Sequence, residues 1–423
     1  MSNINRVAII GLGYVGLPLA IAMAESNRVI GYDIQEKRIL QLIRGYDRNN
    51  EASSESLTKK NITWSSNPED IRHANFYIIT VPTPVDTQNK PDLTAILSAS
   101  RTVGTQLKQG SIVIYESTVW PGLTEEECVP ELEISSGLKW REGFNVGYSP
   151  ERINPGDTKH TLKNITKIVA GDTEETTKKI SELYAPINCN NIYNTPDIRT
   201  AEAAKVIENA QRDINIAFVN EVSQICHKLG LSSADVLEAA STKWNFLNFS
   251  PGLVGGHCIG VDPYYLAYRA EKAGHRPEVI LAGRYLNDGM SAFISSHLTN
   301  KIVAPNSHIL VLGLTFKKNV SDLRNSLIAN IVKLLEKAGH IVDVYDPLAN
   351  HEEAEALYSI KLIESIDFKH SYDCVVGAVG HDSFVQLPIE KVFGLLKEGG
   401  LLADIPGMWK QHPIPSKFLR WQL

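Results

Sequence analysis

The chain has 423 residues, of which 43% are hydrophobic, 21% charged and 8% aromatic, and this composition excludes a disordered or fibrous protein. At roughly 150 residues per domain, the length predicts two or three domains, each able to bury a core. The net charge of −6 argues against general nucleic-acid binding, although an acidic protein can hold an anionic ligand in a locally positive pocket.

The cysteines are few, odd in number and widely scattered. They are Cys128, Cys189, Cys226, Cys258 and Cys374. This spacing fits neither a disulfide framework nor a metal site, so we expect no metal and a reducing, cytoplasmic location. With the exception of Cys258, we expect each cysteine to be a small buried hydrophobic residue.

The N-terminal part alternates apolar runs with helical stretches. Strands are predicted over 7–13, 29–33, 76–82, 111–118 and 144–150, with helices over 17–26 and 36–45. The uncharged segment 7–24 superficially resembles a signal peptide or a membrane span, but three glycines and Pro18 interrupt it, so we expect a strand, a turn and the start of a helix. Alternating strands and helices predict a parallel, doubly wound sheet.

The middle of the chain changes character. Apolar residues at helical spacing predict one long helix over 197–229, and shorter helices over 232–240, 264–273 and 278–300 flank a glycine-rich loop. The C-terminal part then repeats the N-terminal plan, with a strand over 308–316, a helix over 327–338 and a strand over 340–346. The segments 372–381 and 399–406 likewise resemble the predicted strand segments at 75–84 and 110–117. Asp346 ends this strand as Asp33 ends its N-terminal counterpart.

These patterns predict an α/β protein with two Rossmann-like, doubly wound parallel sheets, joined by a long central helix and a helical middle domain. The predicted domains are 1–196, 197–303 and 304–423.

A G-x-G-x-x-G motif follows the first strand and opens a helix. Its glycines, Gly11, Gly13 and Gly16, permit a tight turn, close approach to a pyrophosphate and packing of the helix on the strand. Asp33 suits a ribose diol and would repel a 2′-phosphate, which favours NAD over NADP. Arg38 is near enough to blur that choice, and it could also cover the adenine. The predicted first domain therefore binds NAD.

The corresponding C-terminal turn lacks three glycines and is basic instead. Lys317, Lys318 and Arg324 follow the strand, and such a loop suits a different phosphorylated ligand. Solvated surface charge is the alternative interpretation.

On the long helix, Glu202, Lys205, Asn209 and Arg212 share one face. A lysine and an asparagine amide aimed at one point can stabilise an oxyanion. An exposed stripe with a Glu–Lys pair is the equally open alternative.

Cys258 lies in the sequence GGHCIGVD, where glycines allow an exposed sulfur and Asp262 supplies a carboxylate. A nearby lysine or helix N-terminus would raise the thiolate fraction, so Cys258 is a candidate nucleophile. Further candidates follow strand ends: Thr83 and Thr118, Glu151 as an acid or base, and Arg152 and Lys163 as phosphate ligands.

Six motifs in order, GLGYVGLPLA, ESTVWPG, SPERINPG, EAAKVIENAQRD, GGHCIGVDP and FKKNVSDLRNS, resemble those of the UDP-glucose/GDP-mannose dehydrogenase family over nearly the whole chain. The KWNF and VGGHCIGVDPYYL segments are similar to those of bacterial enzymes that act on UDP-N-acetylglucosamine and UDP-N-acetylgalactosamine in surface-polysaccharide pathways. Gly260-Val261 stands where the glucose branch commonly has Pro-Lys, which weakens a UDP-glucose assignment.

The resemblance implies a four-electron oxidation of the C6 alcohol of a UDP-N-acetylhexosamine to the uronic acid with two NAD⁺. The reaction passes through a thiohemiacetal and a thioester on Cys258. The implied catalytic residues are Cys258, Lys205, Asn209, Asp262, Glu151 and Thr118. Those implied to bind NAD are Gly11, Gly13, Tyr14, Val15, Gly16, Asp33, Arg38, Thr83 and Thr118. Those implied to bind the UDP-sugar are Glu151, Arg152, Lys205, Asn209, Arg212, Gly256, His257, Phe316, Lys317 and Arg324.

Several alternatives stay open at this point. UDP-glucose or GDP-mannose could be the substrate, the chain could be a two-electron dehydrogenase of the hydroxyacid or 6-phosphogluconate type, or it could be a non-catalytic NAD-binding protein. The long helix has more apolar positions than one face can bury, so we expect a homodimer through it. We expect no nucleic-acid and no membrane partner.

Overall fold

The structure, a computed structural model, describes residues 5–49, 51–152, 161–257, 259–302 and 304–423. The chain forms two compact units, Met1–Asn209 with Tyr264–Arg276, and Ala210–Pro263 with Pro277–Leu423. Helix α7 (Ile198–Leu229) continues from the first unit into the second, which confirms the long helix predicted over 197–229. The division into three domains stays a prediction. Across the described ranges, every helix is too short or too polar to span a bilayer.

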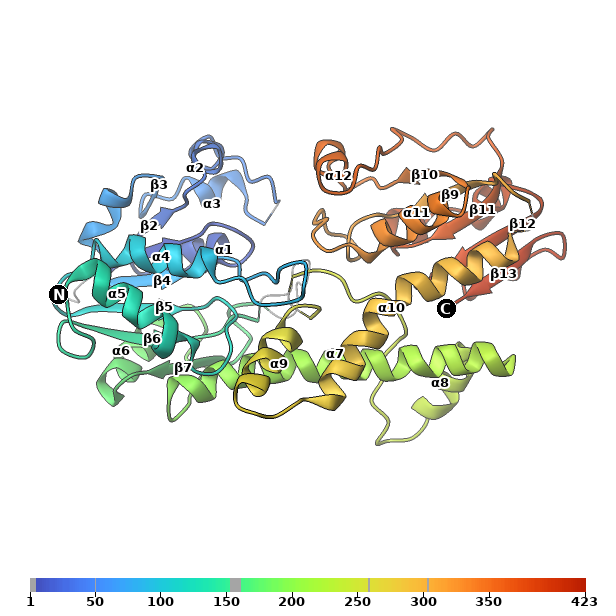
Figure 1. The fold of residues 1–423 in the computed structure, drawn as a ribbon. Coiled ribbons are helices and arrows are strands. Elements are labelled where there is room, and N and C mark those ends of the chain that lie inside the picture. Colours follow the sequence, from blue (N-terminus) through green and yellow to red (C-terminus); the bar gives the residue numbers. More distant parts are fainter. Residues whose placement is uncertain (1–4, 50, 153–160, 258, 303) are drawn as a thin grey trace. The chain divides into compact units, whose positions relative to one another are not determined.

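The first unit is built on a sheet in the order β3-β2-β1-β4-β5-β6-β7-β8, shown in blue to green in Figure 1. All neighbouring strands pair in parallel except β6 and β7, which are antiparallel. Its strands are β1 (Arg6–Ile10), β2 (Arg28–Tyr32), β3 (Ile62–Ser65), β4 (Phe76–Ile79), β5 (Ser111–Tyr115), β6 (Phe144–Tyr148), β7 (Lys167–Gly171) and β8 (Ile192–Asn194).

Helices cover both faces of this sheet because successive strand residues point to opposite sides. Ile9 and Ile78 belong to a core shared with Leu17 of α1 and Ile180 of α6. On the other face, the Tyr115 hydroxyl hydrogen-bonds Ser100 of α4 at 2.7 Å. The helical segments of this unit are α1 (Gly16–Met23), α2 (Glu36–Ile43), α3 (Ser54–Leu57), the 3₁₀ turn η1 (Pro68–His73), α4 (Thr94–Gly104), the π-helical turn η2 (Thr124–Cys128), α5 (Val129–Ser136), α6 (Glu174–Tyr184) and most of α9 (Asp262–Lys272).

The second unit contains a sheet in the order β10-β9-β11-β12-β13, with every pair parallel. Its strands are β9 (His308–Leu312), β10 (Ile341–Tyr345), β11 (Tyr372–Gly377), β12 (Leu396–Asp404) and β13 (Leu419–Gln422). Its helices, besides the C-terminal part of α7, are α8 (Ser233–Ser241), α10 (Glu278–Lys301), α11 (Leu327–Lys337), α12 (His351–Tyr358), α13 (Asp382–Val385) and α14 (Ile389–Gly394).

The two sheets repeat one another as the sequence predicts. The first strand of each sheet in chain order, β1 or β9, is followed by a glycine with positive φ, +93° at Gly11 and +102° at Gly313. The N–H of each glycine donates to the carbonyl of the last residue of the adjacent strand at 2.8 Å. The Rossmann-like prediction for both halves is therefore confirmed.

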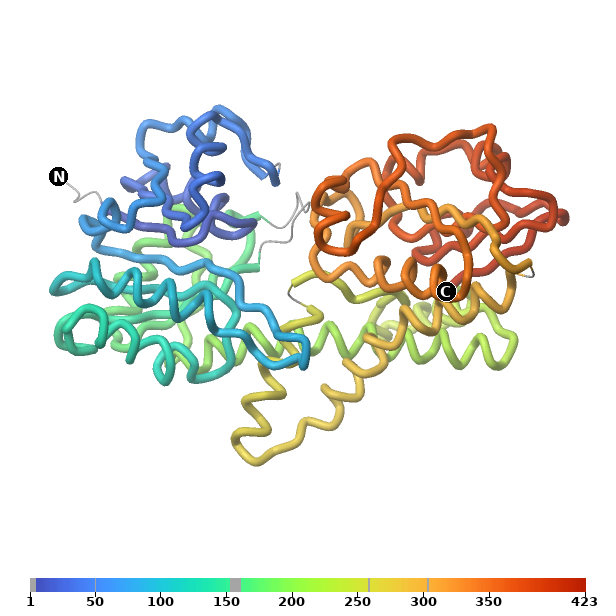
Figure 2. The backbone as a smooth tube through the Cα atoms, turned by 45° about the horizontal axis from the view of Figure 1, so that its top comes forward, coloured from blue at the N-terminus to red at the C-terminus, as the bar shows by residue number. Residues whose placement is uncertain are grey.

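The end of the chain packs within the second unit. Trp421 of β13 shares a core with Met290 and Ile294 of α10, and Figure 2 shows the red C-terminus lying beside that helix. Strands β3, β7, β8 and β13 were not predicted: β3, β8 and β13 are only three or four residues long, and β7 begins with the charged Lys167. Cys128, Cys226 and Cys374 are buried as expected, but Cys189 is exposed because it sits in a turn with φ +54°.

Candidate functional site

The glycine motif forms a tight turn at the carboxyl end of β1. A Cβ on Gly16 would lie 1.9 Å from the Gly11 carbonyl oxygen, so only glycine lets α1 start this close to the strand. A Cβ on Gly13 would meet no atom within 4 Å. The backbone at Gly13 therefore faces open space, as close approach of a pyrophosphate requires.

Asp33, at the end of β2, braces this turn. One carboxylate oxygen accepts the Leu12 N–H at 2.9 Å and the other accepts the Gln35 N–H at 2.9 Å. Arg38 is only 2% exposed; its Nε donates to the Leu12 carbonyl at 3.0 Å and its guanidinium pairs with Asp47 at 2.7 Å. Arg38 thus supports the turn from inside the protein, and its contact with the cofactor stays a prediction.

The other predicted cofactor residues lie on loops at the same edge of the sheet. Since β1, β4, β5 and β6 are parallel, their carboxyl ends meet at one edge, where ligands bind in such sheets. The residues there that are half-buried, with part of each side chain open to solvent, are Tyr14, Val15, Thr83 and Thr118.

Four predicted substrate residues meet at this edge. The Lys205 ammonium donates to the Glu151 carbonyl at 2.8 Å, and both residues are buried. The Arg152 guanidinium donates to Asn209 Oδ1 at 2.9 Å and to the Lys205 carbonyl at 3.1 Å, and it pairs with Glu208. The strand end and the long helix are thereby joined through Glu151, Arg152, Lys205 and Asn209.

Three residues that the sequence interpretation missed stand behind Glu151. Lys167 at the start of β7 donates to Glu151 Oε2 at 2.7 Å and pairs with Glu116 Oε1 at 3.0 Å, and the Tyr184 hydroxyl donates to Glu116. Burial raises the pKa of the Glu116 carboxyl and sets the pKa of the Tyr184 phenol well above its usual value. The only sequence signal was a single charged residue within each of two apolar runs, 111–118 and 167–171.

Glu202 does not join this cluster, although it lies on the same helix face. Its carboxylate accepts the backbone N–H groups of Gly122 at 2.5 Å and Thr124 at 3.0 Å, and it is fully buried. Burial raises the pKa of Glu202 to about 7. The alternative interpretation of an exposed stripe with a Glu–Lys pair is therefore wrong, because Glu202, Lys205 and Asn209 are all buried. Glu202 instead fixes the turn before η2.

In the second unit, the glycine-rich loop packs on the basic turn after β9. Gly256 has φ +80°, and a Cβ there would lie 2.8 Å from the Phe316 ring. Asn325 Nδ2 donates to the Gly256 carbonyl at 3.1 Å. Gly256 and Phe316, both predicted to face substrate, are thus brought together.

Charged residues from the next segment extend this contact. Asp322 lies 3.7 Å from His257 Nδ1 and accepts hydrogen bonds from Arg324 at 2.7 to 3.1 Å. Asp262 is fully buried at the start of α9. Its predicted partner Cys258 lies outside the described residues, so its role rests on the sequence alone. Arg212 is half-buried on α7 within the second unit, and Lys163 is exposed in the first.

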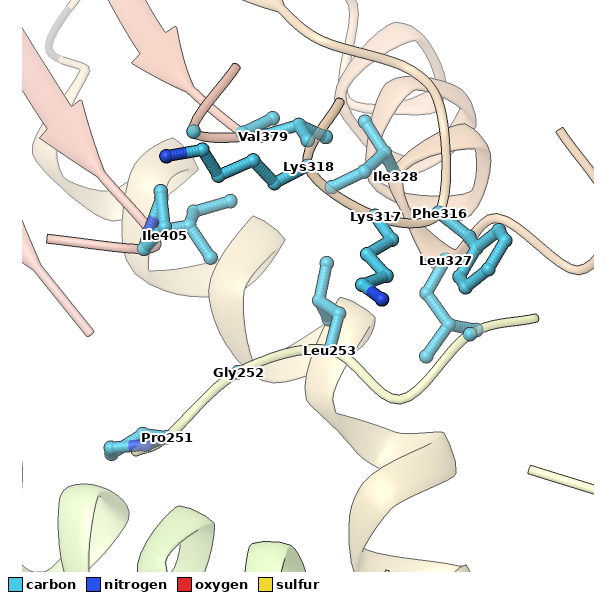
Figure 3. Close-up of a pocket in the computed structure, with 14 residues that line it drawn as sticks. Pro251, Gly252, Leu253, Phe316, Lys317, Lys318, Leu327, Ile328, Val379 and Ile405 are labelled. Atoms are coloured by element: carbon cyan, nitrogen blue, oxygen red, sulfur yellow. The ribbon is translucent and has the colours of Figure 1, made fainter. Parts of the chain in front are cut away.

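A cavity of about 210 Å³ lies between the loop at Pro251–Gly255 and the turn after β9. Figure 3 shows the Lys317 side chain extending toward Leu253 and Leu327, whereas Lys318 points toward Ile405. Largely apolar walls with two lysines at the lining suit a ligand that has a flat ring and a phosphate.

A buried polar network fixes the start of the loop. Asn220 exchanges two hydrogen bonds with the Gly252 backbone, at 2.9 and 2.8 Å, and also contacts Asn287 at 2.8 Å. Asp213 accepts from Asn287 at 2.8 Å and from Arg284 at 2.6 Å. These bonds hold the loop against α7 and α10 within the unit.

Comparison with protein families gives three matches along the chain. Residues 5–188 match the NAD binding domain, 199–289 the central domain and 310–411 the UDP binding domain of the UDP-glucose/GDP-mannose dehydrogenase family.

Individual relatives extend these matches over the full length. A UDP-N-acetyl-D-glucosamine 6-dehydrogenase from Salmonella typhi is 49% identical over 406 residues, 95% of each chain. The enzyme of the same name from Pseudomonas aeruginosa is 45% identical, over 95% of this chain and 96% of its own. A solved UDP-D-ManNAc dehydrogenase from Pyrococcus horikoshii superimposes with a TM-score of 0.88 at 31% identity, over 98% of both chains.

The two glycines of the turn should respond differently to alanine. Gly16→Ala should lower both the thermal stability and the affinity for NAD because its Cβ collides with the backbone. Gly13→Ala should leave stability unchanged and weaken NAD binding by at least about tenfold. Calorimetric titration and thermal unfolding of both variants provide the test. Undiminished NAD binding by Gly13→Ala would contradict the assignment of this turn.

Glu202 should make stability depend on pH. Its folded pKa of about 7 lies above the unfolded value, so the folded state binds more protons between them, and the free energy of unfolding falls as pH rises through that window. Glu202→Gln removes this titration. Between pH 5 and pH 8, the free energy of unfolding of the wild type, measured with denaturant, should fall by roughly 2–3 kcal/mol more than that of the variant. Glu55→Gln, at an exposed site, should track wild type.

Proposed function

This chain belongs to the UDP-glucose/GDP-mannose dehydrogenase family of NAD-dependent oxidoreductases that act on nucleotide sugars, and we propose that it oxidises the C6 alcohol of a UDP-N-acetylhexosamine to the carboxylate. The observation that carries the proposal is the meeting of Glu151, Arg152, Lys205 and Asn209 at the sheet edge that also bears the NAD turn. The resemblance drawn from the six motifs is confirmed.

The predicted division of labour among segments is part of the proposal. Residues 1–196 hold NAD through the glycine turn and Asp33, residues 197–303 supply the catalytic groups, and residues 304–423 hold the UDP moiety. NAD⁺, when bound, supplies the hydride acceptor for both oxidations. The open face at Gly13 fits its pyrophosphate.

Two successive oxidations explain the need for a nucleophile. An alcohol can lose a hydride directly, whereas an aldehyde must first become tetrahedral. We assign that role to Cys258, whose thiolate adds to the C6 aldehyde to give a thiohemiacetal. Loss of the second hydride leaves a thioester, and water hydrolyses it to the acid and the free thiolate. Covalent attachment also keeps the aldehyde from leaving.

The cluster in the first unit supplies the surrounding chemistry. Lys205 is already hydrogen-bonded to backbone and buried, so its charge is preorganised to stabilise the oxyanion of each tetrahedral species, with Asn209 as second donor. Glu151 serves as the base that activates water. Thr118 and Asp262 assist proton transfer, and Arg152 and Arg212 contact the substrate.

The UDP half of the substrate is assigned to the second unit. Lys317 and Phe316 line the cavity beside Gly255. Arg324 and His257 both lie next to the Asp322 carboxylate, at 2.7 and 3.7 Å. The names of the relatives from Salmonella typhi and Pseudomonas aeruginosa favour UDP-N-acetylglucosamine among the N-acetyl sugars. We assign the acid product to surface-polysaccharide synthesis.

The wild-type protein should therefore form two NADH per UDP-N-acetylglucosamine consumed. Rates with the N-acetylgalactosamine and N-acetylmannosamine epimers, UDP-glucose and GDP-mannose, measured in parallel, identify the preferred sugar. Cys258→Ala should abolish acid formation, whereas Cys189→Ala, at an exposed position, should not change it. One NADH per sugar with release of free aldehyde would refute the thioester route.

We also propose that the protein is a homodimer through α7. Phe218, Ile225 and Leu229 are 56%, 51% and 66% exposed and recur every seven and four residues, so they form one apolar stripe. A second copy of the chain can bury the same stripe about a two-fold axis.

Charges placed in this stripe should break the dimer. Wild type should elute with the mass of two chains in light-scattering chromatography, and Phe218→Glu with Ile225→Glu should elute as one. Ile134→Glu provides the control, since Ile134 is also an exposed apolar residue, at 80%, but lies on α5. A monomeric wild type at micromolar concentration would contradict the dimer.

A further inference from the structure

Lys167 is a buried cation with all three of its N–H donors engaged. Its side chain is 5% exposed, and the ammonium donates to Glu151 at 2.7 Å, pairs with Glu116 at 3.0 Å and donates to the Pro150 carbonyl at 3.4 Å. The ammonium also lies 4.9 Å from the centre of the Tyr184 ring. No further acceptor can be added without losing one of these.

Two carboxylates thus share one ammonium. Burial raises the pKa of Glu116 against the attraction of Lys167, and the negative charge of Glu151 raises it further. Protonation of Glu151 therefore removes one of the causes that disfavour an ionised Glu116. Burial alone would lower the pKa of Lys167, but the two carboxylates hold it above the usual value. Two of the three acceptors around the ammonium are carboxylates, which favour its charged form, so it requires an anionic partner throughout the reaction cycle.

The other polar groups around Lys167, Glu116 and Glu151 come from several elements. The Tyr184 hydroxyl of α6 donates to Glu116, and Lys205 of α7 donates to the Glu151 backbone carbonyl, not to its carboxylate. Arg152 is occupied by Asn209 and Glu208. Within the described residues, the ammonium that contacts both carboxylates is that of Lys167.

We propose that Glu116 is a second counter-ion of Lys167, which keeps the buried ammonium paired while Glu151 gains and loses a proton during turnover. Lys167 and Glu116 are then positioning residues that act through Glu151. The inference rests on the proposed function, in which Glu151 is the acid or base.

The reason is the cost of an unpaired buried charge. When Glu151 takes a proton from the attacking water, its attraction for Lys167 is lost while the Glu116–Lys167 pair persists. Glu151 then releases this proton to solvent, and Lys167 stays protonated throughout. If Glu151 were the sole counter-ion, each protonation would leave the buried ammonium without an anionic partner.

Two substitutions should shift the pKa of Glu151 in opposite directions. Glu116→Gln removes a like charge and leaves Glu151 as sole counter-ion, so the pKa of Glu151 should fall by about 1 or more. Lys167→Met removes the cation and should raise it by a similar amount. Lys167→Arg keeps the charge and should stay close to wild type.

Carbon-13 NMR of protein labelled at the glutamate carboxyl measures this pKa directly, with the resonance assigned by its loss in Glu151→Gln. This measurement requires no substrate, so it decides the electrostatic coupling even if the protein turns over none of the proposed sugars. Lys179→Met, which alters an exposed lysine on α6, should leave the titration unchanged.

The second readout is the pH profile of kcat, with the UDP-sugar that wild type turns over fastest. The limb that requires ionised Glu151 should move to lower pH in Glu116→Gln and to higher pH in Lys167→Met. A purely structural role would lower kcat or stability without these opposite movements.

Shifts of the same sign, or no shift in either variant, would overturn the inference. Should Lys167→Met fail to fold, the fall in pKa expected for Glu116→Gln still decides it. If the pKa measured by NMR moves in opposite directions in the two variants but the pH profile of kcat does not move, Glu151 does not act as the acid or base in turnover, and that part of the inference is overturned. Inactivity of wild type on every UDP-sugar would instead contradict the proposed function.

Discussion

The parallel pairing of β1, β4, β5 and β6 is the constraint on which the site in the first unit depends. Register aligns Ile10 with Ile79, Ile79 with Tyr115, and Tyr115 with Tyr148, so the chain leaves all four strands at one edge. Residues that are more than a hundred positions apart in sequence thereby become neighbours. The glycine turn and Glu151 lie at this edge for that reason. Helix α7 passes the same edge and contributes Lys205 and Asn209.

Buried charge imposes a second rule on the same region, because a charge removed from water must be paired or hydrogen-bonded. Lys167 satisfies the rule with two carboxylates, Glu202 with two backbone N–H groups, and Arg38 with Asp47 and a carbonyl. In the second unit, Arg284 and Asp213 obey it beside the glycine-rich loop. Polar groups that look like candidate ligand contacts in the sequence are thus often committed to holding loops.

The two Rossmann-like halves show how one turn can serve two ligands. Both place a positive-φ glycine after the first strand of the sheet in chain order. In both, an aspartate accepts the next N–H, Asp33 from Leu12 at 2.9 Å and Asp346 from Leu314 at 2.7 Å. Burial alone would raise the pKa of the Asp346 carboxyl. The hydrogen bonds that it accepts from His381 and from the turn outweigh burial and hold this pKa below its usual value. After this shared geometry, glycines in one half leave backbone open, whereas Phe316 and Lys317 fill the corresponding turn of the other.

The sequence by itself determined the elements whose signal is local: the glycine turn with Asp33, the long helix, the repeated strand–helix plan and the six ordered motifs. Only the tertiary structure decided which polar residues meet. Glu202 and Lys205 lie one turn apart on α7, yet one caps the turn at Gly122 and the other reaches Glu151, because packing against different strands separates them. The pairing of Lys167 with Glu116 could not be predicted from the sequence, because 50 residues of chain and the antiparallel pairing of β6 with β7 lie between them. Helical and strand periodicity report which way a side chain points, but the partner it finds is set by strand order, and that is a property of the whole fold.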